Sequence, residues 1–395
     1  MCATRGGGRV KDTEKTTPGP DSMPEQLSPA ALQALAADIL RLSKLLTRDR
    51  SELPAAYLSD AALRKAYQAY FLPPNRAKIM LALSELSLHP HKVFQKDRLR
   101  ILDLGSGPGT AVLGALDFFS QQRHRPTLEF IAQDQVAENL KEAARLFSNQ
   151  QHAYSAVSTL FTLHSTISRI EAGLNGRYDI IMLSNLLNEL FAQDAAKLSR
   201  RTELMARLLR TFLAPDGSCI LVEPALQGTS RDLLQVRDAL GEQGFTVYSP
   251  CLRQGPCPAL VNPRDWCHED IPWDAPPLIR ALDKLTGLNK DALKFSYLVL
   301  RLDKISFSDV YGAEAFRVAS EPLISKGKAE YYVCGVAGRK LITRLDKDAS
   351  PQNQAYSGLR RGDIVAFDDL RDEGKRFKVE KGTGVIVRRG GSGSF

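Results

Sequence analysis

Cysteine is scarce in this chain, and a long apolar segment is missing. Six cysteines in 395 residues are too few for a disulfide scaffold, so the sequence predicts a protein of a reducing compartment. No apolar stretch reaches the about 18 residues of a membrane-spanning helix, and we expect no membrane partner. Residues 1–22 lack the apolar core of a secretory signal and the Arg-rich pattern of a clear mitochondrial one, which predicts a flexible leader.

Acidic residues are fewer than basic ones. The chain has 53 Lys and Arg against 45 Asp and Glu, which favours an anionic partner, with nucleic acid ahead of membrane. Basic side chains gather on one predicted helix, at Lys197, Arg200, Arg201, Arg207 and Arg210, and again near the C-terminus. Such side chains would bind phosphates without reading sequence, but an ordinary solvated helix face has the same pattern, and both interpretations stay open.

The spacing of apolar residues changes twice along the chain. Helical spacing predicts an N-terminal helical domain over residues 23–95, in which Pro73-Pro74-Asn75 should end one helix before the next begins at Arg76. Short apolar runs alternating with helices then predict a parallel sheet covered on both faces over residues 96–302. We expect its strands at 100–104, 128–133, 160–163, 178–183, 218–222, 245–248 and 295–300.

Two further segments follow a different pattern. The Pro- and Cys-rich residues 249–277 interrupt the alternation and indicate an insertion between the sixth and seventh strands. Short alternating runs broken by glycine predict a small β domain over 303–389, which could close into a barrel. Residues 390–395 indicate a flexible tail.

A glycine-rich loop follows the first strand of the predicted sheet. It reads Asp103-Leu-Gly105-Ser-Gly107-Pro-Gly109-Thr110 and opens a helix, which suits backbone approach to a cofactor beside a helix N-terminus. Its spacing differs from the G-x-G-x-x-G pattern of dinucleotide sites. The loop resembles motif I of class I S-adenosylmethionine (SAM)-dependent methyltransferases, which predicts SAM over NAD.

Polar residues at two other strand ends should face the same crevice. Asp134 is placed to bind ribose hydroxyls, although capping the helix that begins at Val136 would also explain it. Ser184 and Asn185 follow the fourth strand, where contact with the adenine side of a cofactor and simple N-capping are equal interpretations. The Pro-Pro-aromatic clamp of enzymes that methylate base amino groups is missing here. A cytosine-C5 enzyme would need a cysteine nucleophile, and Cys251 after the sixth strand is only a superficial candidate.

Four of the cysteines suggest a metal site. Cys251, Cys257 and Cys267 fall in the Pro- and Gly-rich insertion, and Cys334 follows a later apolar run. Four thiolates suit either a tetrahedral zinc site or an iron-sulfur cluster, and the lack of any C-x2-C pair weakens a zinc ribbon. His268 could be a ligand or a donor to one, and an ordinary surface-loop histidine is at least an equal interpretation. Unrelated buried thiols are the alternative, and this is the interpretation we give Cys219, within the fifth strand.

Together, the glycine loop, the Asn188-Glu189-Leu190 segment after strand four, Pro256-Cys257-Pro258 and Trp266-Cys267-His268 resemble one family. It comprises methyltransferase-like assembly factors of the mitochondrial small ribosomal subunit and their bacterial relatives. The resemblance implies a class I SAM-methyltransferase fold with a Rossmann-like seven-stranded sheet. It also implies a [4Fe-4S] cluster on Cys251, Cys257, Cys267 and Cys334, and binding to small-subunit rRNA. Ala259 departs from the family, which often has a histidine there.

Three functional hypotheses follow. The first is a SAM-binding, cluster-containing factor that binds small-subunit rRNA and its precursor particle and assists assembly and translation, without DNA as a partner. The second is an active rRNA methyltransferase that uses the same surfaces, and the third is an iron or redox sensor that binds RNA. We expect a monomer, in the mitochondrial matrix if the source is eukaryotic and in the cytoplasm if it is bacterial.

Overall fold

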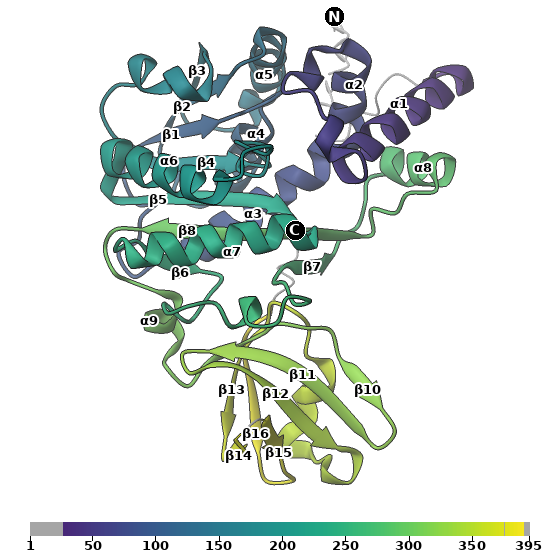
Figure 1. The fold of residues 1–395 in the computed structure, drawn as a ribbon, viewed down its shortest axis with the longest axis vertical. Coiled ribbons are helices and arrows are strands. Elements are labelled where there is room, and N and C mark those ends of the chain that lie inside the picture. Colours follow the sequence, from purple (N-terminus) through teal and green to yellow (C-terminus); the bar gives the residue numbers. More distant parts are fainter. Residues whose placement is uncertain (1–26, 375, 391–395) are drawn as a thin grey trace, which may run out of the picture.

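The computed structural model describes residues 27–374 and 376–390. The leader predicted for 1–22, with Cys2, and the last five residues of the predicted tail lie outside the described residues. Figure 1 shows a large sheet covered by helices and, below it, a smaller part built of strands. No helix among the described residues has both the length and the apolar character that a membrane crossing needs.

The large sheet has seven strands along its main path, in the order β3-β2-β1-β4-β5-β8-β6. The strands are β1 (Arg98–Leu104), β2 (Thr127–Asp134), β3 (Ser158–His164), β4 (Tyr178–Ser184), β5 (Leu213–Pro224), β6 (Thr246–Ser249) and β8 (Ala292–Arg301). The first five pair in parallel, and β8 enters antiparallel between β5 and β6. This is the seven-stranded class I methyltransferase sheet, so the predicted fold class is confirmed.

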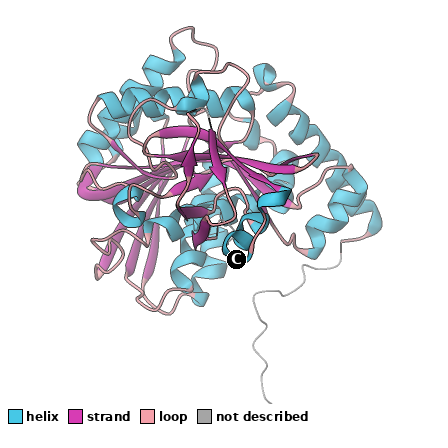
Figure 2. Ribbon diagram, turned by 90° about the horizontal axis from the view of Figure 1, so that it is seen from below, coloured by secondary structure: helices cyan, strands magenta, loops and turns pink. Residues whose placement is uncertain are grey.

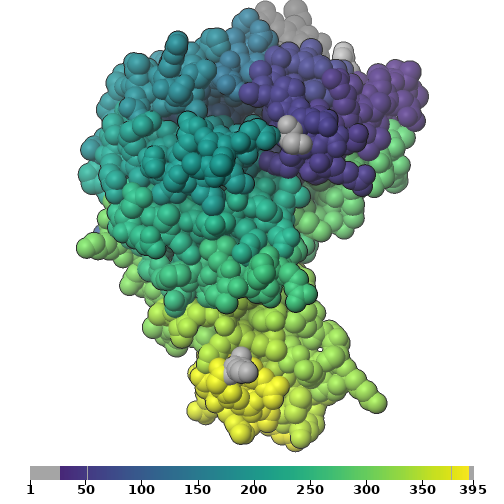
Figure 3. All heavy atoms as spheres, in the orientation of Figure 1, coloured from purple at the N-terminus to yellow at the C-terminus, as the bar shows by residue number. Residues whose placement is uncertain are grey.

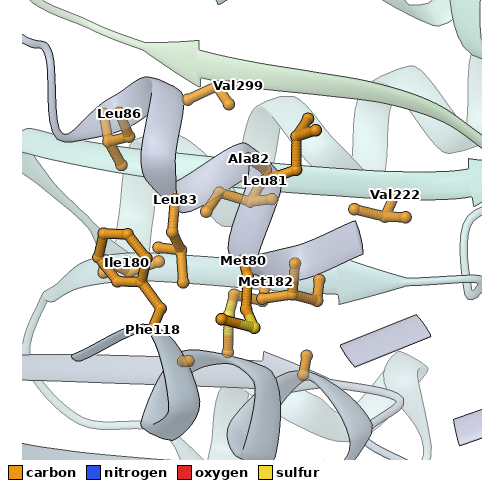
Figure 4. Close-up of a cluster of buried hydrophobic side chains, with 14 of the residues drawn as sticks. Met80, Leu81, Ala82, Leu83, Leu86, Phe118, Ile180, Met182, Val222 and Val299 are labelled. Atoms are coloured by element: carbon orange, nitrogen blue, oxygen red, sulfur yellow. The ribbon is translucent and has the colours of Figure 1, made fainter. Parts of the chain in front are cut away.

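Helices cover both faces of the sheet, as Figure 2 shows from below. They are α3 (Leu72–Leu86), α4 (Thr110–Ser120) and α5 (Ala137–Gln150) on one face, and α6 (Lys197–Phe212) and α7 (Gln227–Glu242) on the other. Neighbouring strand residues alternate between the two cores: Ile101 and Ile180 pack on the first, Leu102 and Ile181 on the second. Figure 4 shows the first core, where Leu81 and Leu83 of α3 meet strand residues such as Ile180 and Val222.

The N-terminal helices extend the first layer. Helix α1 (Pro29–Thr47) packs with α2 (Ala61–Ala66) and with α8 (Pro277–Thr286), a helix that follows the insertion. A π-helical turn at Tyr67–Phe71 leads directly into α3, which begins at Leu72. The prediction that Pro73 and Pro74 break a helix before Arg76 is therefore wrong. They lie in the first turn of α3, directly after the π-helical turn, so the chain stays helical through both prolines.

The insertion contributes one strand that the sequence did not indicate. Its β7 (Glu269–Pro272) pairs antiparallel with β8 and so extends the sheet at the edge near the smaller part. The rest of the insertion is loop, apart from a short turn of 3-10 helix at Pro258–Leu260. The loop that carries Cys251, Cys257 and Cys267 is therefore held at both ends by strands of the sheet, β6 before it and β7 after it.

The C-terminal part, reached through α9 (Phe307–Tyr311), is a second sheet in the order β14-β15-β12-β11-β9-β13-β16, with β10 paired to β11. Its strands are β9 (Phe316–Val318), β10 (Leu323–Ser325), β11 (Lys328–Gly335), β12 (Gly338–Leu345), β13 (Ile364–Asp368), β14 (Arg371–Asp372), β15 (Arg376–Val379) and β16 (Gly384–Arg389). Side chains from six of these strands meet in one apolar core, so the sheet folds over on itself. Among the described strands, the two end strands β14 and β16 do not pair with each other, so the sheet does not close into a barrel.

A buried ion network joins the two parts. The Arg317 guanidinium on β9 lies 2.9 Å from Glu85 Oε1 of α3 and 2.9 Å from Glu269 Oε1 of β7, and it donates to the Tyr297 hydroxyl at 3.1 Å. Burial alone would raise the pKa of Glu85, but Arg317 and Arg389 bring it below its usual value. The side chains of Arg317, Glu85 and Glu269 are each at most 9% exposed. With so little contact with water, the charge of each one depends on the charges of the other two.

We predict that Arg317→Gln destabilises the protein by about 3–5 kcal/mol, because it leaves two carboxylates buried without their cation. The free energy of unfolding measured by denaturant titration tests this. Arg388→Gln is the matched control, because Arg388 pairs with Glu314 at the surface and should contribute about 0–1 kcal/mol. Equal losses in the two variants would contradict the prediction.

Candidate functional site

The glycine loop has a backbone that only glycine adopts easily. Gly105, Gly107 and Gly109 have φ values of 61°, 53° and 86°. A Cβ on Gly105 would lie 2.6 Å from Leu186 Cδ1, and one on Gly109 would lie 3.0 Å from Ala143 Cβ, so space is also missing. The loop is fastened to the end of β2, where the Ser106 amide donates to the Gln133 carbonyl at 2.8 Å. Gly109 caps the start of α4.

A partly open cavity lies at this loop and is lined by residues of the sheet and of the N-terminal helices. Of the predicted cofactor residues, Gly109 is the one that does not line it. The residues brought together are Asp103, Gly105, Gly107, Thr110, Asp134, Ser184 and Asn185. Figure 3 shows the surface recessed where the purple N-terminal part meets the teal sheet part.

Asp103 is a buried carboxylate without a settled partner. It is 1% exposed, and neither of its oxygens accepts a hydrogen bond of ordinary geometry from the described residues. Burial raises the pKa of Asp103 to about 7, and the nearby Ser106 hydroxyl opposes this rise only in part. A buried acid in this state suits a ligand that brings its own cationic or N–H donor, such as the ammonium group of an amino acid.

Asp134 is occupied by its own surroundings. Its Oδ2 accepts from the Gly107 amide at 2.8 Å, and its Oδ1 accepts from the Val136 amide at 2.8 Å and from Asn139 at 3.2 Å. The carboxylate thus fixes the glycine loop against the start of α5. The capping alternative is not met as predicted, because α5 begins at Ala137 with Val136 as its N-cap, and the backbone amide that Asp134 binds there is that of Val136 itself.

Residues that the sequence did not single out cover the cavity. Tyr57 and Tyr67 line it from the N-terminal helices, and the Tyr67 hydroxyl lies 3.4 Å from Thr110 Oγ1. The Tyr57 hydroxyl reaches Glu189 Oε1 at 3.5 Å. Tyr57 falls in a short 3-10 turn with no recognisable motif, so no pattern in the sequence could have placed it here.

A larger open groove adjoins the cavity, and Glu189 lines both. Burial, with a smaller contribution from Glu223, raises the pKa of Glu189 to about 8. Glu223 accepts hydrogen bonds from the Leu187 amide at 2.9 Å and the Asn188 side chain at 2.6 Å. Arg201 of α6 donates to the Asn188 carbonyl at 2.8 Å. These contacts fix the loop after β4, so Glu189 is held at the boundary of the two spaces.

The four predicted metal ligands meet at a second cavity. Cys251, Cys257 and Cys267 from the insertion and Cys334 from β11 all line it, whereas Cys219 is buried within β5. Arg231 of α7 shapes the loop by donating to the carbonyls of Ala259, Leu260, Asn262 and Asp265. Asp238 accepts from the Cys257 amide at 2.9 Å.

The burial of these thiols bears on whether they could bind a metal. Burial, and then the neighbouring cysteines, raise the pKa values of Cys257, Cys267 and Cys334 to about 12, so a bound cation would be needed to hold them as thiolates. Within the described chain, no three cysteine sulfurs lie within 4.8 Å of one another. Tetrahedral zinc with bonds near 2.3 Å would require about 3.8 Å between sulfurs.

A third group of donor atoms does not suit a metal. His89, His91 and Asp303 lie within 4.8 Å of one another. However, His89 Nδ1 accepts the His91 amide at 3.2 Å, which leaves the proton on Nε2, 3.1 Å from Asp303 Oδ2. Arg301 also pairs with Asp303 at 2.6 Å, so this cluster is already neutralised.

The basic residues of α6 all have partners within the protein. Lys197 and Arg201 pair with Asp232, Arg200 with Asp194 and Arg207 with Glu171, while Arg210 donates to the Gln243 carbonyl. Arg201 is buried. These contacts favour the interpretation of α6 as an ordinary solvated helix over its interpretation as a phosphate-binding surface.

Several solved structures are similar in arrangement. The plantazolicin methyltransferase BpumL in complex with SAH is 13% identical, with 68% of this chain and 97% of that chain covered and a TM-score of 0.37. The CurJ carbon methyltransferase is 19% identical, with 70% of this chain and 69% of that chain covered and a TM-score of 0.38. A putative class I S-adenosylmethionine-dependent methyltransferase from Listeria monocytogenes is 13% identical, with 68% of this chain and 79% of that chain covered and a TM-score of 0.36. Scores this low do not identify a cofactor or substrate for this chain.

The sequence itself gives the more specific result. No curated protein matches it. The model of one family, described as mitochondrial small ribosomal subunit Rsm22, matches residues 61–363, which is more than half of the 395 residues. With the methyltransferase sheet in place, the chain belongs to the Rsm22 family of the mitochondrial small ribosomal subunit.

Proposed function

We propose that this protein is a SAM-binding, iron-sulfur-containing factor that binds small-subunit rRNA and assists assembly of the small ribosomal subunit. The observation that carries the proposal is the meeting of four cysteines at one cavity, three from the insertion and one from a strand 67 residues after Cys267. Family membership supports involvement with the small ribosomal subunit. The iron-sulfur centre, SAM and rRNA are the finer parts of the proposal.

The cavity at the glycine loop supports SAM as the ligand. The unpartnered Asp103 carboxylate suits the ammonium of the methionine part, and the glycines leave room for a backbone contact. Ser184 and Asn185 line the same cavity and suit the adenine side. Asp134 would have to share its oxygens between the loop and ribose hydroxyls, so we assign it mainly to holding the loop.

The cysteine cavity supports an iron-sulfur centre held by Cys251, Cys257, Cys267 and Cys334. When bound, such a centre would supply cross-links between separate parts of the chain. Because three ligands belong to the insertion and the fourth to β11, those ligands would hold the C-terminal part to the sheet. A fixed relative position would let the two parts present one continuous surface.

Exposed groups beside this cavity support an RNA partner. Trp266 is 38% exposed and stacks on His268, with 5.6 Å between ring centroids. The exposed Arg264 lies two residues away. Aromatic faces with neighbouring cations suit unstacked RNA bases and phosphates. We propose the mitochondrial matrix as its location in a eukaryote, which the family description supports, and the cytoplasm in a bacterium.

Asp103→Asn should weaken SAM binding at least tenfold, because the neutral amide cannot pair with the ligand's ammonium group. Isothermal titration calorimetry with SAM measures the change. Asp274→Asn is the control, since that side chain is 96% exposed. Unchanged affinity for SAM in the Asp103 variant would show that the methionine end of SAM does not bind beside Asp103.

Cys257→Ala should abolish most of the iron and sulfide of anaerobically purified protein and lower its melting temperature, because the centre stabilises the fold it links. Iron and sulfide per chain and a thermal melt are measured together. The matched control is Cys219→Ala, which alters a buried thiol away from the cavity. A colourless wild-type protein that contains zinc would overturn the iron-sulfur assignment.

The same pair of variants separates the assembly role from redox sensing. Affinity for small-subunit rRNA and cosedimentation with precursor particles are compared in folded samples. An assembly factor held together by its centre should lose particle binding in Cys257→Ala and keep it in Cys219→Ala. A sensor would in addition change its rRNA affinity when the wild-type centre is reduced and reoxidised.

A second candidate function is methyl transfer to rRNA, which the position of Glu189 favours. A carboxylate shared by the cofactor cavity and the open groove lies where a methyl acceptor would meet SAM. There it could take the proton of an attacking hydroxyl or amine as the methyl group leaves the sulfonium. Since its pKa is about 8, the rate would rise as the pH increases through that value.

Glu189→Gln should therefore lower the transfer of labelled methyl groups from SAM to small-subunit particles at least a hundredfold and abolish this pH dependence. The exposed Glu138→Gln serves as control. If neither the wild type nor the control transfers label while both support subunit maturation, the assembly function stands alone.

A further inference from the structure

Five arginines of the described residues line the cysteine cavity, and three of them, from both parts of the molecule, have a buried Nε atom without a hydrogen bond. Arg237 comes from α7, Arg339 from β12, and Arg361 from the segment before β13. Arg237 is 2% exposed at its side chain, and the side chains of Arg339 and Arg361 are 16% and 13% exposed. Each of these cations already has one carboxylate beside it, Asp238 for Arg237, Asp265 for Arg339 and Glu321 for Arg361.

Each guanidinium is held at its terminal nitrogens. Arg237 donates to the Gly255 carbonyl at 2.7 Å and also contacts Asp238. Arg339 donates to Asp265 Oδ2 at 3.0 Å. Arg361 donates to the His268 carbonyl at 3.1 Å. These contacts fix the direction of each side chain.

Among the described residues, the Nε atom of each of these guanidinium groups lacks a hydrogen bond, although Arg361 Nε forms a longer ion pair with Glu321 Oε1 at 3.5 Å. The Nε atoms of Arg237, Arg339 and Arg361 are all buried and make no hydrogen bond within the described part of the chain, and the same is true of His268 Nδ1. Buried donors are rarely left unsatisfied. Their collection around one cavity points to an acceptor inside it.

The arginines also stand next to particular thiols. Arg339 lies directly opposite Cys334 in the pairing of β11 with β12, and Arg361 donates to the carbonyl of His268, the residue after Cys267. Arg237 contacts Asp238, which accepts from the Cys257 amide. The positive charge therefore surrounds the place where the four sulfurs converge, whereas Arg317, which also lines the cavity, is committed to Glu85 and Glu269.

We infer that Arg237, Arg339 and Arg361 donate their Nε–H groups to sulfur atoms of the iron-sulfur centre and stabilise its more negative, reduced form. The inference rests on the proposed function, since it requires that centre. One electron taken from an external low-potential donor adds a negative charge to the centre and breaks no bond. Fixed cations and N–H donors beside the sulfurs favour that state and raise the reduction potential.

The test is a redox titration of anaerobically purified protein, with dithionite as donor and the reduced centre followed by electron paramagnetic resonance. Arg339→Gln and Arg361→Gln should each shift the midpoint to a more negative potential at unchanged iron and sulfide content. Arg339→Lys keeps the charge and should fall between Arg339→Gln and the wild type. Arg344→Gln is the matched control, because Arg344 Nε is also buried and unpartnered but its residue does not line this cavity.

A midpoint that stays at the wild-type value in both glutamine variants, with iron and sulfide retained, would overturn the inference. So would an equal shift in Arg344→Gln. A wild-type protein without iron and sulfide would instead refute the proposed function, so the two failures are distinguishable. Because Arg339 and Arg361 lie on different segments, a folding defect in one variant leaves the other to decide.

Discussion

One buried guanidinium, that of Arg317, determines how the two sheets of this protein meet. It bridges a carboxylate on α3 and another on β7, so three segments far apart in the chain have to arrive together before any of these charges is compensated. Such a network adds little net stability compared with an apolar contact, but it tolerates few alternative arrangements. The cysteine cavity and the short strand β7 both depend on that arrangement.

Much of the fold could be predicted because alternating apolar runs directly express a sheet buried on both faces. All seven main-path strands lie where the sequence placed them, and Asp103, Gly105 and Gly107 reach the expected cavity. Local spacing misjudged Pro73 and Pro74, since a helix start and a helix break look alike without the preceding turn. The domain boundaries, the ligand roles and the monomeric state stay predictions.

The remaining features of the site depend on contacts between distant segments. Tyr57 covers the cofactor cavity from a turn with no motif, and Arg237, Arg339 and Arg361 surround the cysteines from three separate elements. Charged residues are common enough in sequence that none of these stands out. Conversely, the basic run on α6 was conspicuous in the sequence, yet four of its five cations pair with carboxylates of the protein itself.

The pairing of β11 with β9 places Cys334 directly opposite Arg317. Side chains alternate along a strand, so a slip of one residue would turn the sulfur away from the other three and present Val333 to them. The length of the tight turn between β11 and β12 therefore matters for the position of the Cys334 sulfur. A one-residue insertion or deletion in this turn would disturb that position far more than a similar change in other loops of the same sheet.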